Sequence, residues 1–194
     1  MTSREMLKIR IKDIELEYSV EYRNVKYVRY LLRGAKLKLV VPKRFNENIE
    51  DCIHRKDRWL YKKLTEYHEY EKKMDKLTSD KHLVHRSLAE LKQLSRVYLD
   101  KYQDKLNVRV NRVQFRDTTT KWGSCSSLNN ITLSKNLRYL PEHLVAYIIY
   151  HELTHIIVLA HNEKFFNIIK KEFPNYKDFD EELNEYTYML RKYS

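Results

Sequence analysis

The alternation of apolar and polar residues near the start of the chain predicts β-strands. Apolar and charged residues alternate in segments 7–11 and 14–18, and segment 25–32 is rich in β-branched and aromatic side chains. A further strand in segment 36–41 stops at Pro42. These segments are expected to form an antiparallel sheet whose alternating Lys and Arg side chains lie on the solvated face, with a nucleic-acid-binding face as the alternative.

Helical periodicity follows. Apolar residues recur at three- and four-residue steps in segments 48–74 and 82–105, which predicts two amphipathic helices. The polar group at 78–80 is expected to provide the N-cap of the second helix. His82 and His85 would then lie in its first turn. Both are interpreted as surface or packing residues, because no third ligand stands at a suitable spacing.

The second half of the chain combines short strands with helices that carry an apolar stripe. We expect strands at 108–115 and 131–133, separated by a polar loop, and helices that begin near Pro141, Phe165 and Phe179. A sheet with a helix is expected in residues 1–75 and a second group of strands and helices in residues 76–194, packed together as one unit.

The charge balance bears on possible partners. The 194 residues include 38 Lys and Arg against 27 Asp and Glu, a net charge of +11. This excess favours anionic surroundings such as nucleic acid, nucleotides or acidic proteins, although a solvated basic surface without a dedicated partner explains it equally well. With only two glycines, the chain cannot build a phosphate cradle of the GxGxxG or P-loop type.

The chain carries no sign of export or membrane insertion. Its first residues lack the apolar run of a signal peptide, and no window approaches the roughly 18 apolar residues that span a bilayer. Cys52 and Cys125 do not form a CxxC pair, so reduced thiols are expected. We therefore expect a soluble, cytoplasmic protein without a membrane partner.

One motif combines residue type and spacing in a way that indicates chemistry. Residues 151–155 read HELTH, and His161 follows six residues later. On a helix, His151 and His155 lie on one face one turn apart, so both imidazoles can bind one metal ion. In an unbroken helix His161 would lie roughly 9 Å farther along the axis and about 120° around it. The helix must therefore end between His155 and His161 if all three are to share an ion.

Three histidines would leave a fourth position for water, as in catalytic zinc sites. Glu152 would then act as the general base, and one Zn²⁺ per chain is expected. A glutamate from a later helix is an alternative third ligand, and the candidates are Glu181, Glu182 and Glu185.

Further residues extend this motif into a resemblance. Residues 119–127 read TTKWGSCSS, and ITLS at 131–134, Pro141 and Phe165 accompany the HELTH motif. Together they resemble the YgjP-like metallopeptidase-domain family, which is similar to the SprT-like and WLM zinc peptidases. The segments LVVP at 39–42 and WLYKK at 59–63 extend the resemblance over nearly the whole chain.

The resemblance implies a zincin-like α+β fold with an HExxH active-site helix, and residues 76–194 as its metallopeptidase core. It implies His151, His155 and His161 as zinc ligands and Glu152 as the catalytic acid and base. There is one departure. Metzincins share the separation between HExxH and the third histidine, but they have a glycine where this chain has Val158.

The WGSC segment has two interpretations. Trp122, Gly123 and Ser124 would line the substrate cleft if the strand edge before the metal helix pairs with an extended peptide. Alternatively, Trp122 packs under the helix and Gly123 permits a turn. Cys125 is either a small buried residue or a thiolate that approaches the metal.

The leading hypothesis is a zinc metallopeptidase that acts on a peptide or protein. Two alternatives remain open: a metal-dependent hydrolase of nucleotide phosphoanhydrides, and a nucleic-acid-associated protease that acts on DNA-bound proteins. The group that stabilises the oxyanion also remains open, with the candidates Arg116, Arg138, Tyr176 and Tyr186.

Overall fold

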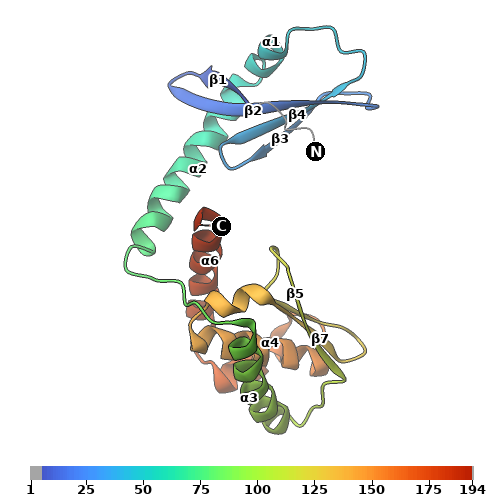
Figure 1. Cartoon of the computed structure of the whole chain (residues 1–194), viewed down its shortest axis with the longest axis vertical. Coiled ribbons are helices and arrows are strands. Elements are labelled where there is room, and N and C mark those ends of the chain that lie inside the picture. Colours follow the sequence, from blue (N-terminus) through green and yellow to red (C-terminus); the bar gives the residue numbers. More distant parts are fainter. Residues whose placement is uncertain (1–5, 194) are drawn as a thin grey trace. The chain divides into compact units, whose positions relative to one another are not determined.

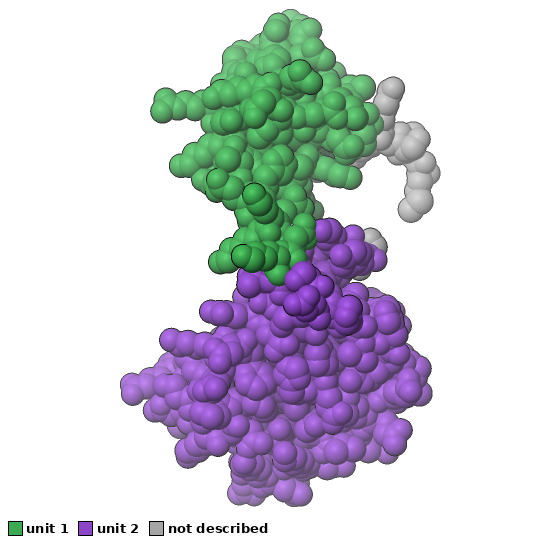
Figure 2. Space-filling view, turned by 90° about the vertical axis from the view of Figure 1, so that its left-hand side faces the viewer, with its two compact units in different colours: residues 1–76 green, residues 77–194 purple. Residues whose placement is uncertain are grey.

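The alternating N-terminal segments form a four-stranded sheet. The computed structural model describes residues 6–193, which cluster into two units divided between Lys76 and Leu77 (Figure 2). The strands of the first unit are β1 (Leu7–Ile11), β2 (Ile14–Arg23), β3 (Arg29–Arg33) and β4 (Lys36–Pro42). Their order in the sheet is β1-β2-β4-β3 (Figure 1).

The expected antiparallel pairing holds for two of the three neighbouring strand pairs. β1 pairs with β2 and β3 with β4 in antiparallel fashion, whereas β2 and β4 are parallel. The burial of the strands explains this order. β4 is buried at four of its seven positions and therefore lies in the centre of the sheet beside β2, while β3 has no buried residue and suits an edge.

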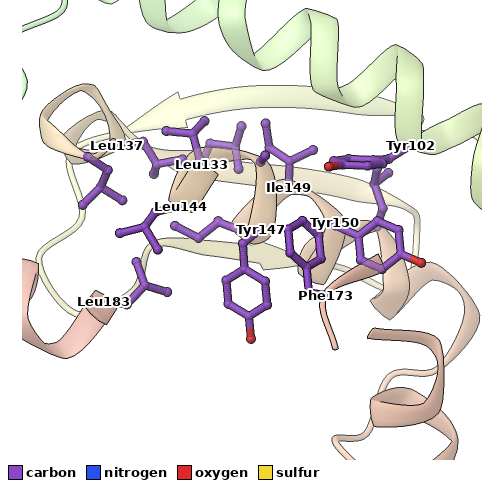
Figure 3. Close-up of a cluster of buried hydrophobic side chains, with 14 of the residues drawn as sticks. Tyr102, Leu133, Leu137, Leu144, Tyr147, Ile149, Tyr150, Phe173 and Leu183 are labelled. Carbon is purple, nitrogen blue, oxygen red and sulfur yellow. The ribbon is translucent and has the colours of Figure 1, made fainter. Parts of the chain in front are cut away.

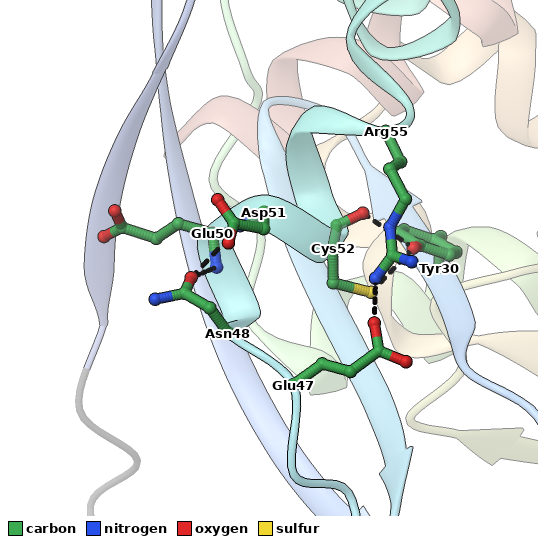
Figure 4. Close-up of polar contacts among 7 residues, drawn as sticks. All are labelled: Tyr30, Glu47, Asn48, Glu50, Asp51, Cys52 and Arg55. Atoms are coloured by element: carbon green, nitrogen blue, oxygen red, sulfur yellow. Dashed lines mark hydrogen bonds and ion pairs between the residues drawn. The ribbon is translucent and has the colours of Figure 1, made fainter.

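Two helices cover one face of this sheet. They are α1 (Ile49–His54) and α2 (Asp57–Leu77), so the helix expected at 48–74 is divided near Arg55. Asn48 caps α1, because its Oδ1 accepts hydrogen bonds from the backbone N–H groups of Glu50 at 2.8 Å and Asp51 at 3.1 Å (Figure 4). The hydroxyl of Tyr30 on β3 donates to the carbonyl oxygen of Cys52 at 2.9 Å and so ties α1 to the sheet.

The core of the first unit lies between the sheet and these helices. Its fully buried side chains come from all these elements except β3 and include Leu16, Leu39, Ile53, Leu60 and Leu64. At roughly 1.5–3 kcal/mol for each buried aliphatic side chain, this layer is the main source of stability in the unit.

The second unit contains a small sheet surrounded by helices. Its elements are α3 (Leu88–Leu106), β5 (Arg112–Arg116), β6 (Gly123–Cys125), β7 (Asn130–Ser134), the 3₁₀-helix η1 (Lys135–Tyr139), α4 (Glu142–Ile157), α5 (Glu163–Glu172) and α6 (Tyr176–Tyr193). The strand order is β5-β7-β6, with β5 parallel and β6 antiparallel to β7. β6 falls inside the segment that was expected to be a polar loop.

The start of α3 differs from the expectation. The helix begins at Leu88 with Ser87 as its N-cap in a capping box with Glu90, and residues 78–80 do not cap it. The backbone N–H groups of Val84 and Arg86 donate to carbonyl oxygens of η1. These hydrogen bonds hold the preceding segment out of the helix, so His82 and His85 lie before α3 and not in its first turn.

α4 runs through the core of the second unit. Ten of its residues are buried, and they pack against the sheet, α3, α5 and α6 (Figure 3). Tyr150 meets Tyr102 edge-on with ring centroids 5.0 Å apart, and Tyr147 meets Phe173 in the same way at 5.3 Å. This aromatic packing fixes the position of α4. Among the described residues, no helix is long and apolar enough to cross a membrane.

Candidate metal centre

The last two turns of α4 carry His151 and His155, and the chain then leaves the helix. α4 ends at Ile157, and Val158 is extended with φ −140° and ψ 106°. The predicted helix end between His155 and His161 is therefore confirmed. Extended backbone is open to any residue and suits a β-branched side chain, so the turn that returns His161 needs no glycine at Val158.

The turn brings three imidazoles together. One ring nitrogen from each of His151, His155 and His161 lies within 4.8 Å of the other two. Nε2 of His161 is 3.0 Å from Nε2 of His151. Nitrogens bound to one tetrahedral zinc ion at about 2.1 Å lie about 3.4 Å apart, so the donor set and its spacing fit this ion.

Phe165 holds the three rings in place. It is fully buried on α5, and its ring centroid lies 4.9 Å from that of His151 and 4.7 Å from those of His155 and His161. Asn162 caps α5, because its Oδ1 accepts from the backbone N–H of Phe165 at 3.1 Å. Phe165 was not among the candidate site residues, although its position four residues after His161 was a usable signal.

Hydrogen bonding and burial favour the ligand form of these histidines. Nδ1 of His155 lies 3.2 Å from the carbonyl oxygen of Val158. A carbonyl oxygen only accepts, so Nδ1 carries the proton and Nε2 keeps its lone pair for a metal. Burial and, to a smaller extent, the positive charges that His155 and His161 can carry lower the pKa of His151 to about 3. Neutral imidazole is the state that binds zinc.

Glu152 lies beside this cluster and directly under β6. Its side chain is 6% exposed, and its Oε2 has no hydrogen-bond partner among the described residues. Burial raises the pKa of Glu152 to about 7, against the opposing effect of Lys121. A β-carbon added to Gly123 would lie 2.6 Å from Oε1 of Glu152. Only glycine therefore permits this approach of β6 to the carboxylate.

A cavity of about 170 Å³ opens next to Glu152. Its walls are formed by Trp122, Gly123, Tyr147, Ile148, His151, Glu152, Asp180 and Leu183. The hydroxyl of Tyr147 donates to Oδ1 of Asp180 at 2.7 Å, which fixes the far wall. Tyr147 was not predicted as a site residue, although its position one turn before His151 indicates the same helix face.

The WGSC segment borders this cavity. Trp122 and Gly123 line it, and Ser124 follows on β6, where it pairs with Thr132 of β7. Among the described strands β6 pairs only with β7, so its other edge is open. Trp122 also packs against the hydrophobic core and lines a second cavity of about 160 Å³ next to Lys121.

The structure places the alternative ligands elsewhere. Glu182 and Glu185 form ion pairs with Lys81 at 3.1 and 2.7 Å, and Glu181 is exposed on α6. The metal-ligating group formed by the described residues includes none of the three. It does not include Cys125 either, whose thiol pKa is raised to about 11 by burial and by the charge of Glu152.

Three of the four candidates for the group that stabilises the oxyanion make contacts away from the histidines. Arg138 donates to the hydroxyl of Tyr139 at 2.6 Å, Arg116 donates to Gln114 at 3.1 Å, and Tyr186 lies under Lys81. Of the four candidates, only Tyr176 is linked to the histidines. Its ring stacks on Phe166 with centroids 5.1 Å apart, and Phe166 stacks on His161 with centroids 6.3 Å apart. Lys121 was missed, although it directly precedes the WGSC residues and its charge acts on Glu152.

The chain is similar to a known protein family and to solved structures. The model of one family, described as the YgjP-like metallopeptidase domain, matches residues 75–186, which is more than half of the chain. No curated protein matches. One similar solved structure is the crystal structure of the metallopeptidase zymogen of Pyrococcus abyssi abylysin. It is 24% identical over 46% of this chain and 90% of that chain, with a TM-score of 0.43.

Proposed function

Because the chain belongs to the YgjP-like metallopeptidase-domain family, we propose that it is a zinc-dependent peptidase. In this proposal His151, His155 and His161 hold the ion, and Glu152 moves the protons. The observation that carries it is the convergence of three imidazole nitrogens within 4.8 Å at the end of a buried helix. Neutral imidazoles in such a set are typical zinc ligands.

The protein groups have separate tasks in this reaction. Bound zinc would lower the pKa of a water molecule and polarise the carbonyl group of the substrate. The carboxylate of Glu152 accepts a proton from the attacking water and passes it to the leaving nitrogen. Burial raises the pKa of Glu152 to about 7, and the charge of a bound zinc ion would lower it again, so the carboxylate form that accepts the proton is present at neutral pH. The backbone of Gly123 lies close against the Glu152 side chain and keeps this carboxylate in one position.

The surroundings of Glu152 favour an extended peptide as the substrate. The open edge of β6 offers backbone groups that can pair with a peptide strand, and the cavity beside it can receive one side chain. Trp122 and Leu183 give this cavity apolar walls. These features support a peptide more than a nucleotide, for which the two glycines of the chain cannot form a phosphate cradle.

The test compares wild type with Glu152→Gln and with the matched control Glu181→Gln, which changes an exposed glutamate in the same unit. Zinc content is measured by elemental mass spectrometry, and cleavage is measured on a peptide library by mass spectrometry. We expect about one zinc ion per chain in all three proteins. Cleavage should fall about 10²- to 10⁴-fold in Glu152→Gln alone.

Two outcomes would contradict the proposal. Undiminished cleavage by Glu152→Gln would exclude Glu152 as the general base. Release of pyrophosphate from nucleoside triphosphates without cleavage of any peptide would exclude a peptide substrate.

A further inference from the structure

The net positive charge of the first unit comes from one stretch of sequence. Residues 22–46 contain no Asp or Glu. The same 25 positions hold eight cationic residues, namely Arg23, Lys26, Arg29, Arg33, Lys36, Lys38, Lys43 and Arg44. A surface kept only for solubility usually mixes both signs, so this stretch calls for an anionic partner.

The structure divides these cations into two groups. Arg23 and Lys38 pair with Glu21, and Lys36 pairs with Glu17. The other five make no ion pair with any described residue, and all five are exposed. We name them the basic edge, which consists of Lys26, Arg29, Arg33, Lys43 and Arg44.

The basic edge follows β3 and one end of the sheet. β3 is an edge strand (Figure 1). Arg29 and Arg33 are both exposed on it, and four residues of strand separate them by about 13 Å. Arg29 pairs in register with Val40, so β3 begins where β4 ends. Lys26 lies just before β3, and Lys43 and Arg44 lie just after β4. Four cations therefore gather at one end, and Arg33 continues the row along the strand.

One exposed aromatic ring lies among these cations. Tyr27 is 69% exposed, and Nζ of Lys26 lies 5.1 Å from its ring centroid. Tyr22 is also exposed at this end of the sheet, but its register with the core residue Val41 places it on the face opposite Arg29 and Arg33. An exposed tyrosine ring next to an unpaired cation matches the two requirements of a single strand, which needs faces for its bases and charges for its phosphates.

We propose that the basic edge binds single-stranded nucleic acid, with phosphates on the five cations and a base stacked on Tyr27. This inference goes beyond the proposed function, because these residues precede the part of the chain that matches the metallopeptidase domain. An anionic membrane surface is less suitable, because interfacial binding typically uses an amphipathic helix with a Trp, Phe or Leu face. The basic edge lies on a strand and its flanking turns.

The experiment measures the binding of fluorescein-labelled dT20 to the full chain by fluorescence anisotropy at several salt concentrations. Wild type should bind at low salt, with a slope of log Kd against log salt of about 3.5 for five phosphates. Arg29→Ala combined with Arg33→Ala should lower this slope by about 1.4 and weaken binding about 25-fold at 0.1 M salt. Tyr27→Ala should weaken binding about 5- to 100-fold with an unchanged slope.

The matched control removes two cations of the same unit that already have a carboxylate partner. It combines Lys62→Ala with Lys63→Ala on α2, where both lysines pair with Glu66, and binding should stay within about twofold of wild type. Circular dichroism melts check that every variant is folded. Chelation of metal should leave binding unchanged, which separates this inference from the peptidase activity.

Several results would overturn the proposal. They are the absence of dT20 binding by wild type at 20 mM salt, an equal loss in both double variants, and binding to phosphatidylserine vesicles without binding to dT20. Tighter binding of a duplex than of dT20, together with no effect of Tyr27→Ala, would also overturn it.

Discussion

Replacing Gly123 by alanine should disable the site through Glu152 without unfolding the protein. The new β-carbon would lie 2.6 Å from Oε1, 2.7 Å from Cγ and 2.9 Å from Cδ of Glu152. Comfortable contacts between carbon atoms are about 3.5–4.0 Å, so one group must move by about 1 Å. These atoms form the outer part of a side chain, whereas Gly123 is held in β6 by its pairing with Leu133. The carboxylate should therefore move, at a typical overpacking cost of about 1–3 kcal/mol.

The displacement should affect catalysis far more than metal binding. A misplacement of about 1 Å of a reacting group can lower a rate about 100-fold, so kcat/KM for a library-selected peptide should fall by about this factor. The three histidines are not touched, so zinc content should equal that of wild type. Kinetics, elemental analysis and a thermal melt on one preparation measure all three quantities. A Gly123→Ala protein with wild-type kcat/KM would refute the reasoning.

The other glycine of the chain provides the matched control. Gly34 has φ +59°, and a β-carbon there would lie 3.0 Å from the hydroxyl oxygen of Tyr67. A left-handed alanine costs about 1–2 kcal/mol, so Gly34→Ala should destabilise the first unit by roughly this amount. Its kcat/KM should remain that of wild type, because Gly34 lies in the unit without the candidate metal site. The two variants should therefore lose similar amounts of stability, while only Gly123→Ala loses activity.

Three further predictions concern other parts of the second unit. His161→Ala removes one of three ligands, so zinc content after dialysis against a chelator should fall at least about tenfold; a full equivalent of zinc would exclude His161 as a ligand. In chelator-treated protein, Cys125 should react with iodoacetamide at pH 8 about 100-fold more slowly than a free cysteine, because burial and the carboxylate of Glu152 raise its pKa to about 11. Peptide mass spectrometry measures the rate of modification. Modification at the rate of a free thiol would contradict the burial argument. The pKa of Glu182 is lowered, because hydrogen bonds from His143 and Lys81 outweigh the opposing effect of burial. Its contribution to stability is therefore present above the ordinary carboxyl pKa and is lost as the pH falls through the lower folded value. Lys81→Met should accordingly lower the free energy of unfolding by about 1 kcal/mol at pH 7 and by much less near pH 2. Urea titrations at both pH values measure these two free energies. An equal loss at the two pH values would exclude the ion pair between Lys81 and Glu182 as the cause.

The parts of the fold that depend on local sequence were predictable. The helical spacing of His151 and His155 and the required helix end before His161 rest only on helix geometry, and the structure agrees with both. The strands of the first sheet, and β5 and β7 of the second, follow from periodicity in the same way. Short-range patterns therefore identified the candidate ligands and the helix that carries two of them.

The parts that depend on tertiary contacts were not predictable. The second long helix was expected from residue 82, but it begins at Leu88 because the backbone of Val84 and Arg86 pairs with η1, about 50 residues later in the chain. The parallel pairing of β2 with β4 likewise depends on which strand is buried in the sheet. β6 has only three residues and no apolar alternation, so its pairing with β7 gives no local signal.

The contact between β6 and α4 explains why two distant motifs specify one site. Gly123 belongs to the WGSC segment and Glu152 to the HELTH motif, and neither motif alone indicates that their atoms touch. The contact requires that β6 lie on α4 with no side chain between them, which glycine alone permits. The two residues that precede Gly123 also contribute to the site. Lys121 lowers the pKa of the Glu152 carboxyl, and Trp122 forms a wall of the cavity beside it. The WGSC segment is therefore the second half of the candidate site, placed over the carboxylate by the fold.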